Sequence, residues 1–417
     1  MNVHDSEKMA GLLLGEGYTI TETLHEADLI LFNTCSIRQK AEQKFMSELG
    51  RTKSLKRKNS LLKIAVAGCI AQQQGGKIIK KNPQVDYVLG PQNLHKLRDM
   101  IRADKAVVAI EDNPEIVNSD MPISRQEGVR AWVSIMYGCD NFCSYCVVPF
   151  TRGRERSRTS DSICREIIGL ASSGFKEVTL LGQNVNSYKS DVDFAGLLKK
   201  TNDIEGIDRI RFVTSHPRDL SEKLMEYLKD LPKVCEHIHL PLQSGSSRIL
   251  KLMNRGYSYD DYIKKAEGLR GLIPGIAITT DIIAGFPSET DADHDLTIKA
   301  LRAIEFDGIF AFKFSPRPGT KAAEMTDRVP DTVKAHRLAE ILNLQDAITF
   351  NKNATLEGTV LEVLTEGISK TDRDKTTGRT RTNKIVNFTG SDSCMGRLVS
   401  VRVIKSMRHS LNGKLVI

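Results

Sequence analysis

Six apolar segments of strand length recur through residues 130–320 and constrain the fold more than any other feature of the sequence. They are AWVSIMYG, EVTLLGQN, DRIRFVTSHP, HIHLPLQSGS, IAITTDIIAGFP and GIFAFKFSPRPGT. Stretches with helical spacing separate them, such as DSICREIIGLASSG and TDADHDLTIKALRAIEF. Because strands that alternate with helices form parallel sheets, the series predicts a partial barrel built like a TIM barrel. Chemistry in such barrels collects at the carboxyl ends of the strands, where the polar tails of these segments fall.

Three cysteines follow the first of these strands. Cys139, Cys143 and Cys146 have the spacing C-x3-C-x2-C, and no fourth cysteine follows at ligand spacing. Closed metal sites normally use four cysteines or histidines. Three thiolates can instead hold three irons of a 4Fe–4S cluster and leave the fourth iron open for a small molecule. A zinc site with a distant fourth ligand and unconnected cysteines are the alternatives, and a position at the mouth of a βα barrel disfavours both.

The first 90 residues show a second, separate α/β pattern. A helical stretch, DSEKMAGLLLGEGY, precedes three strand-like segments, ADLILFNTC, LLKIAVAGC and VDYVLGP. This order predicts a parallel sheet, but the chain opens on a helix where a βαβ unit would open on a strand, so the first strand is expected to be missing. Residues 91–127 contain charged residues, Pro114 and Pro122 and no long periodic element, which predicts a linker.

Two of these strands end in a cysteine. Cys35 and Cys69 each occupy the carboxyl end of a predicted strand. Ligand sites of open parallel sheets form at that edge. The repeated placement favours a ligand role over the alternative, in which both cysteines pack as small apolar side chains.

The C-terminal segment, residues 351–417, differs in pattern and in charge. Alternating β-branched and polar residues with turns between them predict a small antiparallel β barrel of the OB-like kind. The segment has 12 lysines and arginines against 6 acidic residues, so it supplies +6 of the formal net charge of +8. A polyanionic partner, above all nucleic acid, suits this charge, and a solvated face of a small β domain is the alternative.

The rest of the composition excludes several classes of protein. No apolar run approaches the roughly 18 residues that span a bilayer. The opening MNVHDSEKMAGLLLGEG lacks a basic stretch followed by an apolar one, so no secretory signal is expected there. Eight cysteines are too few for a disulfide scaffold in 417 residues, and reduced thiols or metal ligands in the cytoplasm are expected.

Taken together, these motifs resemble those of the radical S-adenosylmethionine (SAM) enzymes and, more narrowly, the methylthiotransferases. The resemblance covers essentially the whole chain. In the stretches MNVHDSEKM, FNTCSIRQKAEQK, LLGQNVNSY, HLPLQSGS and GRTRTNKIVNF the sequence is most similar to the tRNA subgroup known as MiaB. The resemblance implies an N-terminal α/β domain over residues 1–110, a partial (β/α)6 radical SAM barrel over 125–350, and an RNA-binding TRAM domain over 351–417.

The resemblance also implies an activity. Members of this subgroup add a methylthio group to carbon 2 of N6-isopentenyladenosine, next to the anticodon of tRNA. They use two 4Fe–4S clusters and SAM, and their partners are the anticodon stem-loop of tRNA, a reducing electron donor and a sulfur donor, with no membrane. Two alternatives stay open: methylthiolation of threonylcarbamoyladenosine or of a ribosomal protein, and a non-catalytic RNA-binding protein with an incomplete auxiliary cluster site.

The cysteines of this chain match the two cluster motifs of the family. By motif match, Cys139, Cys143 and Cys146 carry over as ligands of the SAM-binding cluster. Cys35 and Cys69 match two ligands of an auxiliary 4Fe–4S cluster. The third ligand of that cluster would lie two residues before Met1, and a truncated sequence is expected rather than a lost site.

Candidate SAM contacts follow from the tails of the barrel strands. The resemblance places Gln183 at the methionyl amine and Gln243 and Ser244 near the ribose. Arg255 would pair with the SAM carboxylate, a geometry that suits a guanidinium. For each of the four, a turn or capping role is the alternative. No catalytic side chain is assigned beyond the cluster ligands.

Overall fold

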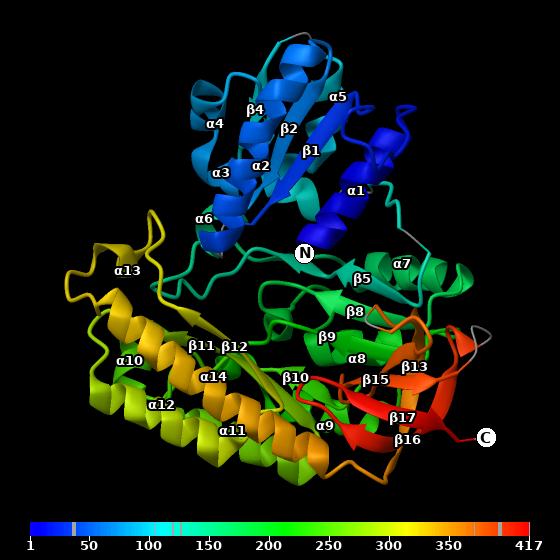
Figure 1. Cartoon of the computed structure of the whole chain (residues 1–417), viewed down its shortest axis with the longest axis vertical. Helices are drawn as coiled ribbons and strands as arrows, with labels where there is room; N and C mark the ends of the chain where they lie inside the picture. The colour runs from blue at the N-terminus through cyan, green and yellow to red at the C-terminus, as the bar shows by residue number, and fades with distance from the viewer. Residues whose placement is uncertain are drawn as a thin grey trace.

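Three parts make up the chain, and Figure 1 shows how they are arranged. An α/β unit in blue lies at one end, a larger parallel sheet structure in green and yellow follows, and a small barrel in orange and red lies beside the far end. The computed structural model describes residues 1–35, 39–103, 105–118, 121–125, 127–370, 372–390 and 394–416. Among these residues, no helix combines the length and the apolar character that crossing a membrane requires.

The N-terminal unit is a four-stranded parallel sheet with helices on both faces. Its strands, in spatial order, are β1 (Leu29–Thr34), β2 (Lys63–Gly68), β3 (Tyr87–Leu89) and β4 (Val107–Ala109). Its helices are α1 (Asn2–Leu14), α2 (Gln39–Lys58), α3 (Cys69–Gln74), α4 (Gly76–Lys81) and α5 (Leu97–Ile101), with 3-10 turns η1 (Pro91–Lys96) and η2 (Pro114–Asn118). Successive side chains of a strand point to opposite faces, so Ile64 joins one apolar cluster and Ala65 the other.

The predicted linker over residues 91–127 is wrong in its first part. Residues 91–101 form η1 and α5, and β4 pairs with β3 from Tyr87↔Val107 onward. Each of these elements has three to six residues. Elements this short do not develop a recognisable periodicity, so the sequence pattern missed them.

The central part holds the six predicted parallel strands in sequence order. The first sheet contains β5 (Arg130–Ser134), β8 (Glu177–Leu181) and β9 (Arg209–Phe212), and the second contains β10 (His237–His239), β11 (Ala277–Ala284) and β12 (Gly308–Lys313). The amide of Ser215 donates to the carbonyl of His239 over 3.3 Å and links the two sheets. A hairpin of β6 (Met136–Tyr137) and β7 (Arg156–Ser157) flanks the three-cysteine loop. This arrangement confirms the predicted partial barrel.

Helices lie on the outer faces of these two sheets and at the carboxyl ends of their strands. They are α6 (Val148–Thr151), α7 (Ser160–Ser172), α8 (Phe194–Asn202), α9 (Glu222–Asp230), α10 (Ser247–Leu252), α11 (Tyr259–Leu272), α12 (Asp291–Ile304), α13 (Lys321–Glu324) and α14 (Asp331–Ala354), with 3-10 turns η3 (Val185–Ser187) and η4 (Pro217–Asp219). Of these helices, α6, α10 and α13 lie at the carboxyl ends of the strands. Capping boxes begin two of the others, Ser258 with Asp261 at α11 and Thr290 with Asp293 at α12.

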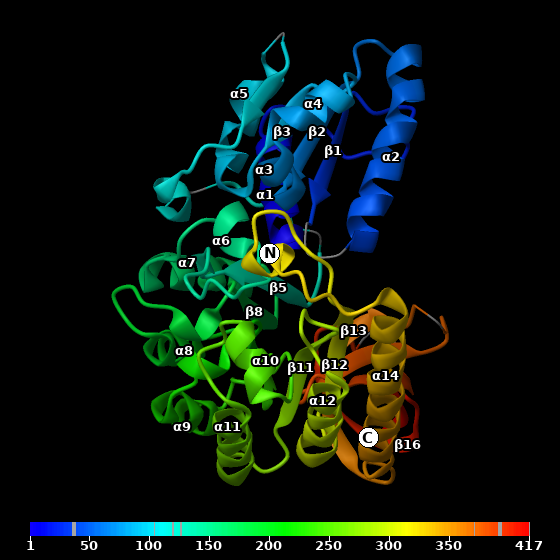
Figure 2. The same ribbon diagram turned by 90° about the vertical axis from the view of Figure 1, so that its left-hand side faces the viewer.

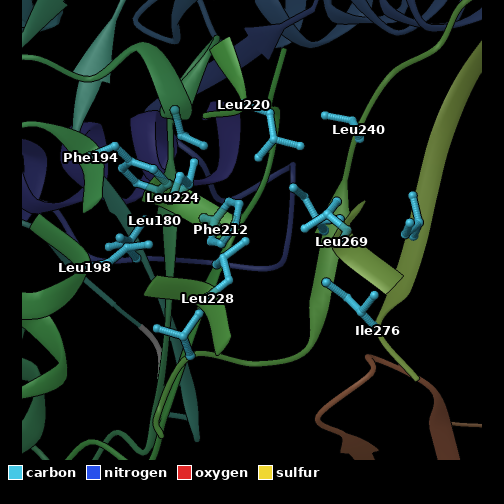
Figure 3. Close-up of a cluster of buried hydrophobic side chains, with 14 of the residues drawn as sticks. Leu180, Phe194, Leu198, Phe212, Leu220, Leu224, Leu228, Leu240, Leu269 and Ile276 are labelled. Carbon is cyan, nitrogen blue, oxygen red and sulfur yellow. The ribbon is translucent and has the colours of Figure 1, made fainter. Parts of the chain in front are cut away.

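An apolar core lies between these helices and the sheets, and Figure 3 shows part of it. Leu180 of β8 and Phe212 of β9 are 0% exposed, and Leu228 of α9 packs in the same cluster. The ring of Phe194 from α8 meets Phe212 edge to face at 5.2 Å. Burial of each such side chain contributes about 1.5–3 kcal/mol. The core thereby holds the strands in position, and with them the polar segments that follow their carboxyl ends, such as GQN after β8 and TSHP after β9.

The C-terminal part is a closed five-stranded barrel. Around the ring its strands are β13 (Val360–Ile368), β14 (Thr376–Thr380), β15 (Ile385–Thr389), β17 (Leu411–Leu415) and β16 (Leu398–Ser406). The predicted closure is confirmed, but the pair β15–β17 is parallel rather than antiparallel. Five strands cannot alternate in direction around a closed ring, so one neighbouring pair has to run the same way.

This barrel covers the amino-terminal ends of the central strands. Arg209 of β9, with a fully buried side chain, donates to the carbonyl of Arg379 over 2.6 Å and to Glu362 Oε1 over 2.8 Å. Arg211 donates to the carbonyls of Thr380 and Arg381, each over 2.7 Å. The contact places the C-terminal barrel at the end of the sheets opposite to their polar tails.

Part of the positive charge of residues 351–417 is used at this contact. Arg381 pairs with Glu236 at 2.7 Å, and Arg408 pairs with Asp346 of α14 at 3.0 Å. The prediction that this charge is available to a polyanion therefore applies to the remaining, exposed cations rather than to all 12.

Candidate functional site

The three-cysteine loop closes over the carboxyl end of the central sheets. Cys143 is 9% exposed, and its carbonyl accepts a hydrogen bond from the amide of Cys146 at 2.9 Å. Ser144 ties the loop to two helices, since its amide donates to Met253 at the end of α10 and its carbonyl accepts from Ala322 of α13. Gly138 has a φ of +75°, and a Cβ there would lie 2.0 Å from the carbonyl oxygen of Arg154, so the loop requires glycine at its entry.

The donor set of this loop fits an iron–sulfur cluster. Burial raises the pKa of Cys139 to about 11 and that of Cys146 to about 12, so both are thiols unless a metal or a cation stabilises the thiolate. In the part of the chain that the structure describes, no three cysteine, histidine or carboxylate side chains converge on one metal ion. The thiolates of a 4Fe–4S cluster bind different irons and do not have to converge on one point. Three thiolates on one loop are therefore a donor set that fits a cluster, in which each binds its own iron.

Arg255 lies beneath this loop and contacts one of its sulfurs. Its Nη1 donates to Cys143 Sγ and to the hydroxyl of Tyr145, each over 3.4 Å, and its Nη2 donates to the carbonyl of Pro241 over 2.9 Å. Burial lowers the pKa of Arg255, but Tyr145 and Tyr257 raise it well above its ordinary value. A permanent positive charge beside Cys143 would offset the negative charge of a cluster bound at this loop.

The other three predicted SAM contacts fall on the same end of the barrel. Gln183 follows β8, and its buried Oε1 has no hydrogen-bond partner among the described residues. Gln243 has a φ of +73°, and its backbone pairs with Asp281 and Ile283 of β11. Ser244 is 1% exposed, and its hydroxyl lies 3.4 Å from Thr297 Oγ1 and accepts from the amide of Ser246. The structure thus brings Gln183 to the site with an unpaired acceptor. It brings Arg255 there with all three guanidinium nitrogens already hydrogen-bonded, and it holds Ser244 within a turn.

Unpaired buried polar atoms follow two neighbouring strands at this end. They are Gln183 Oε1 and Asn184 Oδ1 after β8, and Ser215 Oγ and His216 Nε2 after β9, none with a partner among the described residues. Buried polar atoms are almost always hydrogen-bonded, because leaving one unpaired costs about 1–3 kcal/mol. A polar ligand such as SAM would supply the missing partners.

His216 is a site residue that the sequence pattern did not single out. Burial, followed by the charge of Arg255, lowers its pKa to about 2, so the imidazole is neutral. Nδ1 accepts from the amide of Arg218 at 3.2 Å, which assigns the proton to Nε2. His216 therefore presents one hydrogen-bond donor to the site. The polar tail TSHP was the available clue, but histidines of such tails are common in turns.

The two N-terminal cysteines lie at adjacent strand ends. The parallel register of β1 and β2 ends at Thr34↔Gly68, so Cys35 and Cys69 directly follow one register pair. Thr34 Oγ1 donates to the carbonyl of Ala67 over 2.6 Å and holds the two ends together. The predicted placement at one sheet edge is present, and the ligand role stays a prediction. The three residues after Cys35 lie outside the described part of the chain.

Arg152 connects this sheet edge to the three-cysteine loop. It follows α6, is 4% exposed, and donates to Asp5 Oδ2 over 2.7 Å. Burial lowers its pKa, whereas Asp5 and the thiol of Cys69 raise it above its ordinary value. Arg317, beyond β12, pairs with Glu42 at 3.5 Å. Burial lowers the pKa of Arg317, whereas Glu42 and Cys35 act to raise it. The two groups of cysteines therefore face one shared interface.

Comparison with protein families finds three matches along the chain. The radical SAM superfamily matches residues 133–301, the uncharacterized protein family UPF0004 matches residues 1–90, and the TRAM domain matches residues 354–416. Among curated proteins, a tRNA-2-methylthio-N(6)-dimethylallyladenosine synthase of Thermodesulfovibrio yellowstonii is 55% identical over 418 residues, which cover 100% of this chain and 96% of the relative. A protein of the same name from Caldicellulosiruptor saccharolyticus is 49% identical over 426 residues, with 100% and 90% covered.

Solved structures show the same fold at low identity. The radical SAM methyltransferase TsrM of Kitasatospora setae, with cobalamin and a [4Fe-4S] cluster bound, matches with a TM-score of 0.56 and 14% identity, over 76% of this chain and 73% of TsrM. The cobalamin-dependent SAM radical enzyme OxsB matches with a TM-score of 0.52 and 13% identity, over 83% and 53%. At these identities the likeness concerns the fold alone.

Proposed function

The chain belongs to the family of tRNA-2-methylthio-N(6)-dimethylallyladenosine synthases, and from this membership we propose how its own residues serve that reaction. The chain is a radical SAM transferase that adds a methylthio group to a dimethylallylated adenosine of tRNA. Its cofactors are 4Fe–4S clusters and SAM, and its TRAM domain binds RNA. We divide the chain into domains over residues 1–110, 125–350 and 351–417.

The observation that carries the site assignment is the position of Arg255 against Cys143 at the carboxyl end of the barrel, beside unpaired polar atoms. We assign Cys139, Cys143 and Cys146 as ligands of the SAM-binding cluster. When bound, this cluster and SAM supply the electron and the carbon radical for the reaction. Arg255 keeps a positive charge next to the loop, and a carboxylate of the ligand would take the place of one of its present partners, such as Tyr145 or Tyr257.

Other residues of the chain orient the ligand and exclude water. Gln183 and His216 offer one buried acceptor and one buried donor at the ends of β8 and β9. Tyr145 lies between the ligands Cys143 and Cys146 in the sequence. It packs with the apolar side chains of Phe286 and Phe314 and helps to keep water out of the site. We keep Gln243 and Ser244 as ribose contacts. The backbone of Gln243 already pairs with β11 and the hydroxyl of Ser244 lies within a turn, so we assign these contacts to the side chain of Gln243 and the backbone of Ser244.

We assign Cys35 and Cys69 to the auxiliary cluster. Their adjacent positions after one register pair support this assignment. Arg152 contributes a buried positive charge beside Cys69, which offsets the negative charge of thiolate ligands. A reducing electron donor and a sulfur donor are the remaining partners that we propose, and we propose the cytoplasm as the location of the reaction, in keeping with a tRNA substrate.

Mass spectrometry of tRNA nucleosides tests this function. Cells that lack the gene should lose the 2-methylthio derivative and accumulate N6-isopentenyladenosine, and reintroduction of the wild-type gene should reverse both changes. A Cys143→Ala gene should fail to do so. Unchanged levels of the methylthio nucleoside in the deleted strain would refute the function. Accumulation of unmethylthiolated threonylcarbamoyladenosine would refute the assigned substrate.

A further inference from the structure

Helix α2 carries an excess of positive charge that the reaction site does not use. Its 20 residues contain seven lysines and arginines and two glutamates. This +5, together with the +6 of residues 351–417, exceeds the +8 of the whole chain, so the remainder of the chain is net acidic. Helix α14, with 24 residues, has three lysines and arginines and three acidic residues, so long exposed helices of this protein are not basic as a rule.

The cations of α2 share its exposed face. Lys44, Arg51 and Lys58 are spaced by seven residues and lie on one side of the helix with Ser47 and Ser54, and all five are exposed. We call these five residues the α2 stripe. The opposite side, which includes Phe45 and Leu49, is buried against the sheet.

The α2 stripe has little compensating charge. In the described part of the chain, its one ion pair joins Arg51 to Glu48 at 3.0 Å, and both of these side chains are exposed. Exposed pairs of this kind contribute about 0.2–1 kcal/mol and exchange readily for another anion. Between the cations, Gly50 faces open space, since a Cβ there would meet no atom within 4 Å. Small and hydroxylated residues between cations allow a phosphate chain to approach the helix closely.

The helix dipole explains only the cations at the C-terminal end of α2. Cations favour the last turn of a helix, and Lys56, Arg57 and Lys58 occupy it. Lys56 has a local role as well, because it pairs with Asp86 at 2.8 Å. Neither reason applies to Lys44 or Arg51, which lie in the first half and the middle of α2.

The position of α2 connects the α2 stripe to the reaction site. Near its N-terminus, Glu42 pairs with Arg317 and accepts from Gln74 of α3, the helix that begins at Cys69. From there 20 residues of α helix extend about 30 Å away from the site. Figure 2 shows α2 and the C-terminal barrel along the same side of the molecule. An RNA that has a base in the site and leaves it on this side of the molecule would pass along α2.

We propose that the α2 stripe binds the phosphate backbone of the RNA stem that adjoins the loop carrying the target adenosine. The inference rests on the proposed function and names which part of the RNA this surface holds. Unpaired loop bases are splayed into protein pockets, whereas a duplex is held through its phosphates and its shape. A straight row of cations without aromatic side chains suits the second kind of contact.

Binding measurements with two RNAs test the proposal. The RNAs are a hairpin with the anticodon stem and loop, and the loop strand without its stem. The variant is Lys44→Gln/Arg51→Gln/Lys58→Gln, which retains good helix formers. The expected result is hairpin affinity weakened at least 10-fold, with loop-strand affinity unchanged. Each lost phosphate contact lowers the slope of log K against log salt by about 0.9, so the slope should fall by about 2–3.

A matched variant controls for general charge. Lys199, Lys229 and Lys264 are exposed on α8, α9 and α11, and Lys199→Gln/Lys229→Gln/Lys264→Gln removes the same charge elsewhere. This variant should bind the hairpin like wild type, and both variants should cleave SAM at the wild-type rate.

Three outcomes would overturn the proposal. They are a stripe variant with unchanged hairpin affinity and salt slope, equal loss of affinity for the hairpin and the loop strand, and equal loss in both triple variants. Binding is measured without SAM, so failure of the wild-type protein to modify a hairpin would count against the proposed function and not against this surface.

Discussion

Arg255 donates a hydrogen bond to the sulfur of Cys143 over 3.4 Å, although 112 residues separate the two in the chain. The same guanidinium donates to the carbonyl of Pro241 over 2.9 Å, after β10. One side chain thus hydrogen-bonds both to the three-cysteine loop and to the segment that follows β10. Its planar fork makes these contacts at once, which a lysine ammonium cannot reproduce.

Arg255→Lys should therefore impair SAM binding and cleavage more than cluster assembly. The lysine keeps the charge near Cys143 but loses the hydrogen bonds to Tyr145 and to the carbonyl of Pro241. Hydrogen bonds that involve a charged group contribute about 1.5–3 kcal/mol, so SAM cleavage at subsaturating SAM should fall roughly 10- to 100-fold. Iron content should stay near the wild-type value. Chemical iron analysis and the yield of 5′-deoxyadenosine measure the two effects, and a parallel loss of both would contradict a specific role in SAM binding.

Cys143→Ala and Cys35→Ala should separate the two cysteine groups. Loss of a ligand of the SAM-binding cluster should abolish reductive SAM cleavage. Loss of Cys35, at the end of β1, should leave that cleavage near the wild-type rate and abolish methylthio transfer. Cys164→Ala, on α7, is the control and should preserve both activities. SAM cleavage that persists in Cys143→Ala would disprove the site assignment.

The cysteine positions could be predicted because strand ends are visible in a sequence. Cys35 and Cys69 each end an apolar run, and parallel neighbours bring such ends together, as the register at Thr34↔Gly68 shows. Strand β4 could not be predicted in this way, since its three residues carry no period. The parallel pair β15–β17 follows from closure of five strands and not from local pattern.

Side-chain partners were harder to predict than positions. Arg209 and Arg211 alternate along β9, which indicates one charged face, but the cover for that face comes from residues 153 to 170 positions later. Arg255 was predicted from its motif to meet a carboxylate, and the sulfur of Cys143 as its neighbour needed the fold of the intervening 112 residues. Long-range contacts of this kind leave no local sequence pattern.

Arg211→Met should destabilise the contact between the central partial barrel and the C-terminal TRAM domain. Arg211 Nε lies 2.9 Å from Glu177 Oε2, with the two side chains 5% and 0% exposed. Removal of one partner leaves a buried, uncompensated charge, which costs about 3–5 kcal/mol. Urea denaturation should show this loss in the free energy of unfolding. The double variant Arg211→Met/Glu177→Gln should recover part of it, and equal stability of the single and double variants would rule out the ion pair as the cause.

His237 should make stability depend on pH in the acid range. Burial, then the charge of Arg211, lowers the pKa of His237 to about 3, so the native state leaves it neutral. Below an unfolded pKa of about 6.5 the unfolded chain gains a proton that the native state does not bind. The free energy of unfolding therefore falls by about 1.4 kcal/mol per pH unit from pH 6.5 downward until the native group titrates.

His237→Gln should remove that component of the slope. Denaturation between pH 6 and pH 4.5 measures it, and stability should fall less steeply in the variant than in wild type. His239, Thr279 and Arg379 also surround the imidazole and remain unchanged in this comparison. His25→Gln, at an exposed position, should leave the slope as it is. Identical slopes for His237→Gln and wild type would disprove the assignment.

The RNA-binding role of the TRAM domain is best tested on its exposed cations. Deletion of residues 351–417 would expose Arg209 and Arg211, so loss of RNA affinity after deletion would have two explanations.

Arg397, Lys405 and Lys414 are exposed, and no ion pair holds them in the described part of the chain. Arg397→Gln/Lys405→Gln/Lys414→Gln should weaken tRNA binding and lower its salt slope by up to about 2–3, while the thermal midpoint stays unchanged. Arg381→Gln, which loses the pair with Glu236, should do the reverse and lower stability with little effect on the slope. If the triple variant binds tRNA with the wild-type salt slope, the exposed charge of this barrel is a solvated surface, and the RNA contacts of the chain lie elsewhere.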